Sequence, residues 1–404
     1  TSLIPLATFP LVGVLTPAQV GESYGSPLIL LLLGGFMLSV AMERSGAHRR
    51  IALNMVSLVG GSSGRRLVLG FMAASAFLSM WISNVATTLM LLPIVMAVLD
   101  KVTDRRLRVA MLLGVAYAAS VGGVGTPVGT PPNLIFLDNY KNITGVAPSF
   151  LEWMSWALPV VIVMVPIVGL WLTRGLGQQD SVELPDVGAW RPAEIRTLVV
   201  FATTAVLWVT REAPYGGWSG ALGLENANDA SVALLAVVGM FLIPNGEGEN
   251  LLDWKTAVSI PWGILILFGA GITIAAAFNA SELSELIGTK LAGLVEAMPP
   301  LLLIASSCLA VTFLTEVTSN TATSNLLMPI LAAAAIAAGI EPKLIMVPAT
   351  ISASFAFMLP VATGPNAVIF GSDQLTVRDM AREGIALNLI GVVVVSGVCY
   401  WMFG

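Results

Sequence analysis

The sequence has 404 residues, of which 56% are hydrophobic and only 11% are charged, and its net charge is −5. A soluble domain carries roughly 25% charged residues, so this composition excludes an ordinary soluble globular protein. The sequence has one histidine, His48, and two cysteines, Cys308 and Cys399. These are too few side chains to favour a metal centre or histidine-based catalysis.

Apolar stretches of membrane-spanning length recur along the chain and predict an all-α polytopic membrane protein. A single crossing needs about 20 apolar residues. Two stretches, 67–99 and 300–340, are too long for one crossing and lack a polar loop for two, so each is expected to form a re-entrant hairpin. In chain order the stretches are 28–42, 67–99, 109–137, 154–173, 197–210, 231–243, 258–280, 300–340, 344–371 and 384–404.

The two longest stretches belong to an internal repeat. Residues 77–94 read FLSMWISNVATTLMLLPI and residues 313–330 read FLTEVTSNTATSNLLMPI, with nine of 18 positions identical. A second matched pair follows, PVGTPPN at 127–133 and PVATGPN at 360–366, with five of seven positions identical. Because the order and the spacing of the matches agree, we interpret the chain as a duplication with a Ser-Asn pair at the tip of each hairpin.

Glycine and proline interrupt the helix that follows each hairpin. The segments 122–132 and 360–365 cannot remain helical, because proline removes a backbone donor and glycine loosens the backbone. Broken backbone at membrane depth is tolerated only where it is buried in protein or lines a cavity. Matched interruptions in two halves of a chain therefore point to the binding site of a transporter.

The repeat also has an unmatched part. The second half places a helix at 196–211 ahead of the segment 231–243, which corresponds to residues 2–14. We therefore expect at least one further helix upstream of Thr1.

The positions of Lys and Arg orient the chain in the membrane. If the loops 43–66, 100–108, 174–196, 244–257 and 372–383 share one side, 15 of the 19 cations lie there. Only Lys141, Arg211, Lys290 and Lys343 then lie on the other side. The positive-inside rule places the first side in the cytoplasm. The hairpins then enter from opposite sides, which predicts two inverted repeats and a C-terminus outside.

Three segments lie between the predicted spans. The polar, proline-bearing stretch 174–196 is expected to be a cytoplasmic linker between the repeats. The segments 48–59 and 282–296 have apolar residues at helical spacing. Such segments are either amphipathic helices at the membrane interface or ordinary helices that flank loops.

The two tips bring hydroxyls, amides, free backbone groups and helix ends to the middle of the membrane. Oxygen donors suit a monovalent cation such as sodium, and helix N-termini suit an anion. No Lys or Arg lies inside the apolar stretches, so a co-bound cation is the remaining counter-charge for an anionic substrate. The alternative is that Ser, Thr and Asn only join packed membrane helices.

One carboxylate, Glu316, lies well inside an apolar stretch. Glu316 either contacts substrate or a proton, or it is a buried group that fixes the second hairpin. The first repeat has Met80 at the matching position, and this asymmetry favours the structural role.

These motifs resemble those of the divalent anion/sodium symporters, a family that includes bacterial di- and tricarboxylate transporters, and the resemblance covers essentially the whole chain. The resemblance implies a homodimer that works by an elevator motion. A scaffold domain would comprise residues 1–66 and 197–299 with the interfacial arm helices. A transport domain would comprise residues 67–173 and 300–404, each part with one hairpin and one broken helix, and 174–196 would link the repeats.

The resemblance also implies site residues by motif position. The first sodium site would use Ser79, Ser83, Asn84 and Gly129, and the second would use Thr315, Thr318, Asn320 and Ala362. The substrate would contact Ser83, Asn84, Val85, Thr130, Ser319, Asn320, Thr321 and Thr363. Two positions depart from the family's pattern, because Val85 replaces the usual threonine of the first motif and Gly364 replaces the proline of the second break.

We therefore predict a secondary active transporter, not an enzyme, in the inner (plasma) membrane. It would take up C4-dicarboxylates such as succinate, malate or fumarate together with sodium, with the bilayer and a second copy as partners and no nucleic acid. The nearest alternative keeps the fold and is a sodium-independent dicarboxylate exchanger or a sulfate transporter. More distant alternatives are a channel, an inorganic-anion efflux pump of related architecture, and an intramembrane enzyme, for which Glu316 has no nearby His, Asp or Lys as a partner.

Overall fold

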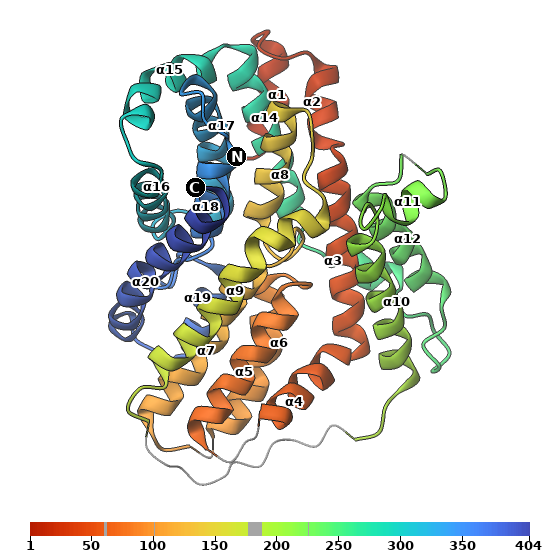
Figure 1. Ribbon diagram of the computed structural model, residues 1–404. Coiled ribbons are helices and arrows are strands. Elements are labelled where there is room, and N and C mark those ends of the chain that lie inside the picture. Colours follow the sequence, from red (N-terminus) through yellow and green to blue (C-terminus); the bar gives the residue numbers. More distant parts are fainter. Residues whose placement is uncertain (60–62, 101, 177–187, 225) are drawn as a thin grey trace.

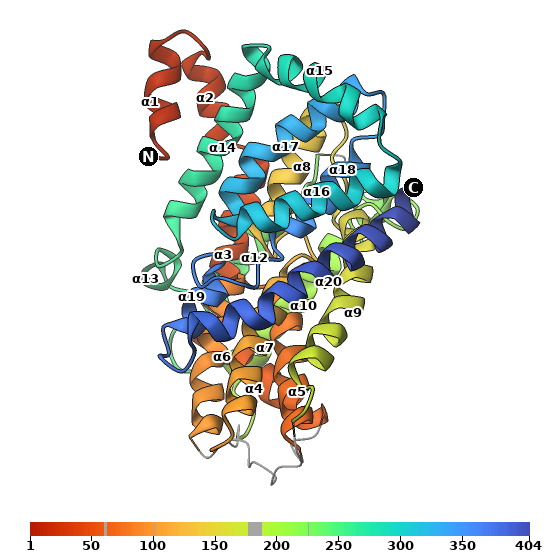
Figure 2. The same cartoon turned by 90° about the vertical axis from the view of Figure 1, so that its left-hand side faces the viewer.

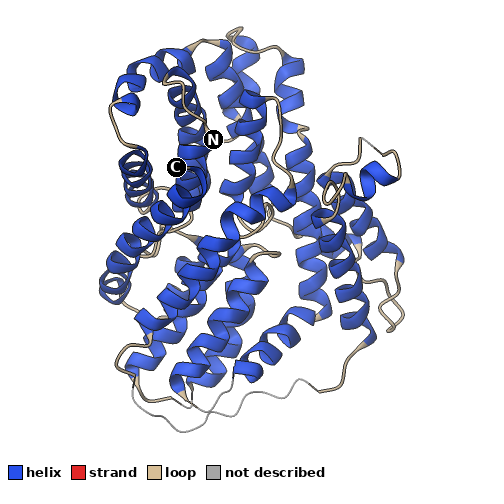
Figure 3. Ribbon diagram, in the orientation of Figure 1, coloured by secondary structure: helices blue, strands red, loops and turns tan. Residues whose placement is uncertain are grey.

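The computed structural model describes residues 1–59, 63–100, 102–176, 188–224 and 226–404, and the secondary structure of these residues is helical (Figure 3). Among the described residues, six helical segments are long and apolar enough to cross a membrane. They cover Pro17–Ser45, Phe150–Leu172, Pro192–Val209, Trp262–Ala280, Asn320–Ala337 and Val377–Phe403. The predicted all-α, multi-pass membrane protein is confirmed.

The first half of the chain forms nine helices from its described residues. They are α1 (Ile4–Leu11), α2 (Pro17–Tyr24), α3 (Pro27–Ser45), α4 (Ala47–Val59), α5 (Gly64–Ser79), α6 (Asn84–Leu99), α7 (Arg105–Gly123), α8 (Pro131–Thr144) and α9 (Phe150–Leu172). Residues 177–187 of the predicted linker lie outside the described residues, which resume at Gly188.

The second half begins with α10 (Pro192–Val209), α11 (Gly217–Ala221), α12 (Asp229–Leu242) and α13 (Trp254–Ala257). The helices after them follow the same order as those of the first half. The remaining helices are α14 (Trp262–Ala280), α15 (Leu283–Glu296), α16 (Pro300–Thr315), α17 (Asn320–Ala337), α18 (Lys343–Ala353), α19 (Gly364–Phe370) and α20 (Val377–Phe403).

Local sequence explains where many of these helices begin. Proline occupies the first position of several of them, where its missing N–H costs nothing and its fixed φ suits a helix. Other helices begin after a Ser, Thr, Asn or Asp whose side chain accepts a backbone N–H of the first turn. Two of these caps, Ser83 and Ser319, lie at the predicted tips of the hairpins.

Two helix pairs meet in short turns at the positions predicted for the hairpin tips, and a non-helical segment follows each pair. Helices α5 and α6 meet at residues 80–83, and α16 and α17 meet at residues 316–319. The first break runs from 124 to 130, and the second runs from 354 to 363 and so begins earlier than the predicted 360–365. The two helix pairs approach the middle of the molecule from opposite ends (Figures 1 and 2).

Glycine allows close approach at two helix contacts. A β-carbon at Gly34 on α3 would lie 2.6 Å from Cβ of Ala233 on α12. A β-carbon at Gly122 on α7 would lie 2.2 Å from the carbonyl oxygen of Ala76 on α5. Small residues at these positions let helix backbones pack tightly, as is usual in membranes.

Ion pairs connect the loops that were predicted to share one face. They join Arg44 to Glu249 and Asp253, Arg50 to Glu194, Arg105 to Asp379, and Arg174 to Glu383. On the opposite face the Tyr140 hydroxyl donates to Glu341 Oε1 at 3.0 Å. The loops therefore group as the charge distribution predicted.

Candidate functional site

The first hairpin turns through a helix cap. Ser83 precedes α6, and its Oγ accepts the backbone N–H of Ala86 at 3.2 Å. The next residue, Asn84, is only 8% exposed. The cap therefore fixes the direction of α6 and places the Asn84 side chain inside the protein, at the predicted tip.

The Asn84 amide lies in a group of oxygen atoms. One atom at its tip is 2.7 Å from Ser79 Oγ, 3.1 Å from the Gly129 carbonyl oxygen and 3.3 Å from the Ala119 carbonyl oxygen. The structure therefore brings together Ser79, Asn84 and Gly129, three of the four residues predicted for the first sodium site. The Ala119 carbonyl is an additional member that the sequence did not indicate.

Glycine makes this group possible. A β-carbon at Gly123 would lie 2.1 Å from Asn84 Oδ1, and one at Gly129 would lie 2.4 Å from the Gly123 carbonyl oxygen. Either contact is far inside van der Waals distance. The break between α7 and α8 can wrap around the Asn84 amide only because both positions lack a side chain.

The second hairpin repeats this arrangement. One tip atom of the Asn320 amide is 3.0 Å from Thr315 Oγ1, 3.0 Å from the Ala353 carbonyl oxygen and 3.3 Å from the Ala362 carbonyl oxygen. Thr315, Asn320 and Ala362 are three of the four residues predicted for the second sodium site. Ala353 ends α18 as Ala119 lies near the end of α7, so the carbonyl from the helix end recurs as well.

Only one orientation of each amide satisfies these neighbours without a bound ion. If the tip atom is nitrogen, it has two hydrogens for three oxygen neighbours. If the tip atom is oxygen, the group consists of oxygens alone and can bind a cation. The two orientations of an amide side chain place a nitrogen or an oxygen at the same position.

The two clusters are connected across the halves of the chain. Val85 follows Asn84, and a β-carbon at Gly364 would lie 2.2 Å from Val85 Cγ2. Gly364 begins α19, two residues after Ala362. Helix α19 contacts α6 and α7 (Figure 2), so the second break lies against the tip of the first hairpin.

Two asparagines that were not predicted as site residues hold the breaks in shape. Asn133 Nδ2 donates to the carbonyl oxygens of Gly123 at 3.2 Å and Thr126 at 2.7 Å. Asn366 Nδ2 donates to the carbonyl oxygens of Ala356 and Leu359, both at 3.0 Å. Asn is identical in the PPN and GPN copies, so the repeat contained the signal for both residues.

Glu316 fixes the second break. Its Oε1 accepts the Met358 backbone N–H at 2.9 Å and the Asn388 amide at 2.7 Å, and its Oε2 accepts the Leu359 backbone N–H at 3.0 Å. Asn388 Oδ1 in turn accepts the Phe357 N–H at 3.1 Å. These amides cannot also continue α18, which explains why the break begins before Pro360. The contacts agree with the predicted structural role of Glu316.

The other predicted residues lie around the clusters with different contacts. Thr318 Oγ1 bonds to the Leu314 carbonyl oxygen at 3.0 Å and to Thr323 Oγ1 at 2.5 Å, and neither atom belongs to the Asn320 cluster. Thr363 caps α19, and its Oγ1 accepts the Asn366 N–H at 3.2 Å.

The remaining substrate candidates differ in exposure. Thr130 is buried at the start of α8, Ser319 caps α17 and is exposed, and Thr321 is half-buried. Val85 is 39% exposed. The described residues contain no group of three or more His, Cys, Asp or Glu side chains that could hold a metal ion.

The apolar helices, the paired turns and the paired breaks define a helical membrane protein, and the family match identifies it as a transporter. The chain matches the family described as "Sodium:sulfate symporter transmembrane region" over residues 1–403, and it belongs to that family. The predicted resemblance is confirmed.

Named relatives match the whole chain. It is 36% identical over 427 residues to the sodium-dependent dicarboxylate transporter SdcS of Staphylococcus saprophyticus, a match that covers 100% of this chain and 81% of that protein. SdcS of Staphylococcus aureus matches with the same identity and coverage.

Two solved structures share the fold. The YdaH transporter of Alcanivorax borkumensis superposes with a TM-score of 0.66 at 17% identity, over 97% of this chain and 87% of that one. MtrF of Neisseria gonorrhoeae superposes with a TM-score of 0.69 at 16% identity, over 98% of this chain and 85% of that one.

Proposed function

We propose that this chain is a sodium-coupled transporter that takes up a C4-dicarboxylate such as succinate, malate or fumarate. The observation that carries this proposal is the pair of oxygen clusters around Asn84 and Asn320. The named relatives, which are called sodium-dependent dicarboxylate transporters, supply the substrate class.

The oxygen spacing supports a cation in each cluster. Around Asn84 the tip atom lies 3.1 and 3.3 Å from two carbonyl oxygens, and around Asn320 it lies 3.0 and 3.3 Å from two others. A cation that takes oxygen ligands at about 2.4 Å, as calcium does, holds neighbouring ligands at right angles roughly 3.4 Å apart. Sodium is of similar size and prefers the same hard oxygen donors. Ser79 would complete the first set, and Thr315 the second.

The substrate would lie between the tips. Ser83 and Ser319 cap α6 and α17, whose N-terminal dipoles favour a negative charge. No Lys or Arg lies in the apolar stretches that contain the tips, so bound sodium would supply the positive charge that the anion lacks. This arrangement couples the two solutes, because each bound ion lowers the cost of desolvating the other.

A sulfate transporter is the second candidate, because the family description names sulfate. Sulfate would occupy one oxyanion position between the tips, whereas a C4-dicarboxylate would span two. Competition distinguishes them: unlabelled succinate should block uptake of labelled succinate at lower concentration than sulfate does.

The packing supports a division into scaffold and transport domains. Helices α3, α10 and α12 contact one another, and the hairpin helices contact α7, α9, α18 and α20. The arm helices α4 and α15 contact the hairpin helices α5 and α17, respectively. In the proposed elevator motion, residues 67–173 and 300–404 would move as one body against residues 1–66 and 197–299.

We extend the proposal to a homodimer in the inner (plasma) membrane. Helix α12 exposes Leu235 and Leu242, which are 67% and 71% exposed, and α10 exposes Val206, which is 60% exposed. A second copy on this face would cover these side chains. The C-terminus would lie outside, opposite the Arg-rich face. Disulfide cross-linking of an L235C variant in membranes tests the dimer, because the native Cys308 and Cys399 are buried.

Uptake into proteoliposomes tests the proposed function. Labelled succinate should enter faster with an inward sodium gradient than with choline. S79A and T315V each remove one hydroxyl from a cluster and should raise the sodium concentration for half-maximal uptake about tenfold. S231A, which changes an exposed serine on α12, is the matched control. Succinate uptake that is equal in sodium and choline would overturn the proposal.

A further inference from the structure

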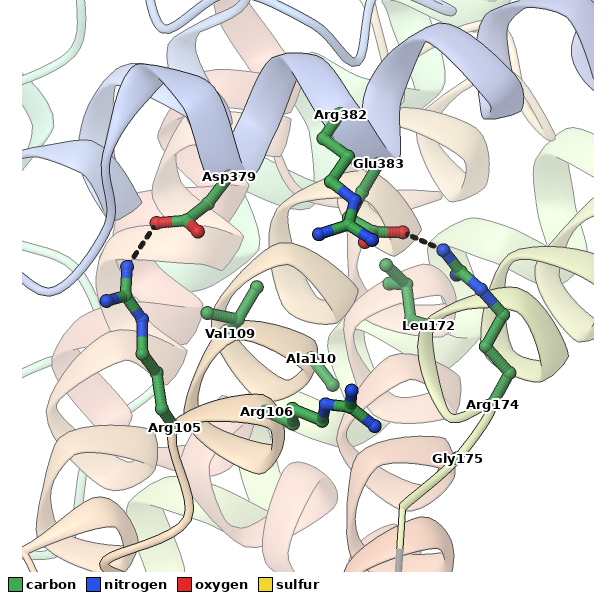
Figure 4. A pocket seen from close by; sticks show the side chains of 10 residues that line it. All are labelled: Arg105, Arg106, Val109, Ala110, Leu172, Arg174, Gly175, Asp379, Arg382 and Glu383. Carbon is green, nitrogen blue, oxygen red and sulfur yellow. Dashed lines mark hydrogen bonds and ion pairs between the residues drawn. The ribbon is translucent and has the colours of Figure 1, made fainter.

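A charged pocket lies where three helices end, apart from the hairpin tips. It has a volume of about 430 Å³ and is formed by the first turns of α7 and α20 and the last turn of α9 (Figure 4). Its charged lining consists of Arg105, Arg106, Arg174, Arg382, Asp379 and Glu383. A cavity of this size is in the range of small-molecule sites.

The two carboxylates of the pocket are each paired with one arginine at its edge. Arg105 Nη2 lies 2.9 Å from Asp379 Oδ2, and Arg174 Nη2 lies 2.6 Å from Glu383 Oε2. Asp379 and Glu383 lie one turn apart on α20 and so face the same side. These pairs hold the ends of α7 and α9 against α20.

Two further arginines line the pocket outside these ion pairs. Arg106 and Arg382 reach into the pocket from opposite sides in Figure 4, and neither forms an ion pair with a described carboxylate. The charged lining therefore has an excess of two positive charges. The N-termini of α7 and α20 add the positive ends of two helix dipoles.

The pocket floor is apolar. Leu172 and Ala110 are buried there, and Val109 is half-buried. Beside the floor, the Arg174 guanidinium lies over the Trp171 ring, 3.9 Å from its centre. Tryptophan at the end of a spanning helix is typical of the boundary between water and lipid. A basic edge above an apolar floor at this boundary fits an amphiphilic anion.

We propose that this pocket binds a phosphate group, carried either by an anionic phospholipid head group or by a soluble phosphate ester. Arginine forks match phosphate oxygens in pairs, and Arg106 and Arg382 have donors to spare. Basic pockets between membrane helices on the cytoplasmic side commonly hold lipid head groups. A phosphate here joins α7 and α9 of the first half to α20 of the second half.

Binding to the purified full-length chain in detergent tests the site. The probes are dioleoyl phosphatidylglycerol, zwitterionic dioleoyl phosphatidylcholine, glycerophosphate and inorganic phosphate. We expect the R106Q/R382Q variant to bind phosphatidylglycerol about tenfold more weakly than the wild type, because it loses charge-assisted hydrogen bonds. R49Q/R65Q removes the same charge from exposed positions outside the pocket and should bind like the wild type.

The soluble probes separate the two sources of phosphate. If the wild type binds glycerophosphate or inorganic phosphate and R106Q/R382Q does not, the site is assigned to a soluble ester. If the wild type binds phosphatidylglycerol alone, the site is assigned to a lipid. If the double variant does not fold, the single variants R106Q and R382Q are measured with the same probes. Equal affinity of the variants and the wild type for every probe overturns the proposal. Equal affinity of the wild type for phosphatidylglycerol and phosphatidylcholine, with no soluble phosphate bound, also overturns it.

Discussion

Val85 at the tip of the first hairpin and Gly364 at the start of α19 are packed so closely that a β-carbon at position 364 would lie 2.2 Å from Val85 Cγ2. These are the two positions that the resemblance predicts to depart from the family's pattern, and they lie against each other. A branched side chain on one element is matched by the absence of a side chain on the other. The two positions therefore match each other in volume.

The contact predicts a mutation and its rescue. G364A should reduce succinate uptake, because Val85 is β-branched and has little freedom to rotate in the first turn of α6. Overpacking of this kind costs about 1–3 kcal/mol. V85A/G364A should restore uptake toward the wild-type level, measured as initial rates in proteoliposomes. Failure of V85A to improve the G364A protein would show that the contact does not limit transport.

A second glycine is expected to control the sodium response. A β-carbon at Gly123 would lie 2.1 Å from Asn84 Oδ1, so G123A must displace the Asn84 amide from its oxygen neighbours. The sodium concentration for half-maximal uptake should rise about tenfold, an effect within the usual cost of overpacking. G239A on α12, where a β-carbon would contact nothing within 4 Å, is the control. An unchanged sodium response in G123A would remove Asn84 from the sodium site.

The local parts of this architecture could be predicted from the sequence. Duplicated Ser-Asn pairs marked the two caps, and Gly-Pro runs marked the two breaks, because caps and breaks depend on residues that are neighbours in the chain. A role for Asn133 and Asn366 could also have been predicted, since both asparagines lie in the duplicated motif.

Contacts between distant segments could not be predicted in this way. No periodicity indicates that Val85 meets Gly364, or that Glu316 binds the amides of Met358 and Leu359. The arginine pocket likewise exists only because three separate helices end at one place. Hydrophobic pattern specifies that a helix is buried, and side-chain packing decides which residues it meets.

Glu316 offers a test between its two roles. Its carboxylate accepts hydrogen bonds on both oxygens, so the amide nitrogen of E316Q would face at least one backbone or side-chain donor. An unmatched buried donor costs about 1–3 kcal/mol, and we expect a lower melting temperature with an unchanged pH profile of uptake. E285Q on α15, an exposed position, is the control. A shifted pH profile would instead assign Glu316 to proton or substrate binding.

His48 predicts how stability responds to acid. Burial lowers the pKa of His48 below its usual value, against the opposing effect of a hydrogen bond to the Met42 carbonyl oxygen. The folded protein therefore binds this proton more weakly than the unfolded chain does. The resulting stabilisation is complete above the unfolded pKa of about 6.5 and is lost as pH falls through the folded pKa. Between pH 7 and pH 5 the wild type should lose more thermal stability than H48Q, and equal losses would contradict this prediction.

The buried pair of Arg50 and Glu194 should contribute to stability without contributing to sodium binding. Arg50 Nε lies 2.9 Å from Glu194 Oε2, and both side chains are only 5% exposed. Removing one partner of a buried pair leaves an uncompensated charge and costs about 3–5 kcal/mol, whereas replacing both with apolar residues is often neutral.

E194M should therefore lower the melting temperature strongly, and R50M/E194M should recover much of the loss. Arg50 also donates to the Gly188 and Ala189 carbonyl oxygens, so recovery in the double variant should be incomplete. E247A on the exposed loop after α12 is the control. Because the pair joins α4 to the start of α10, away from both asparagine clusters, the sodium dependence of any remaining uptake should match that of the wild type. A changed sodium response in R50M/E194M would show that this anchor is coupled to the hairpin tips.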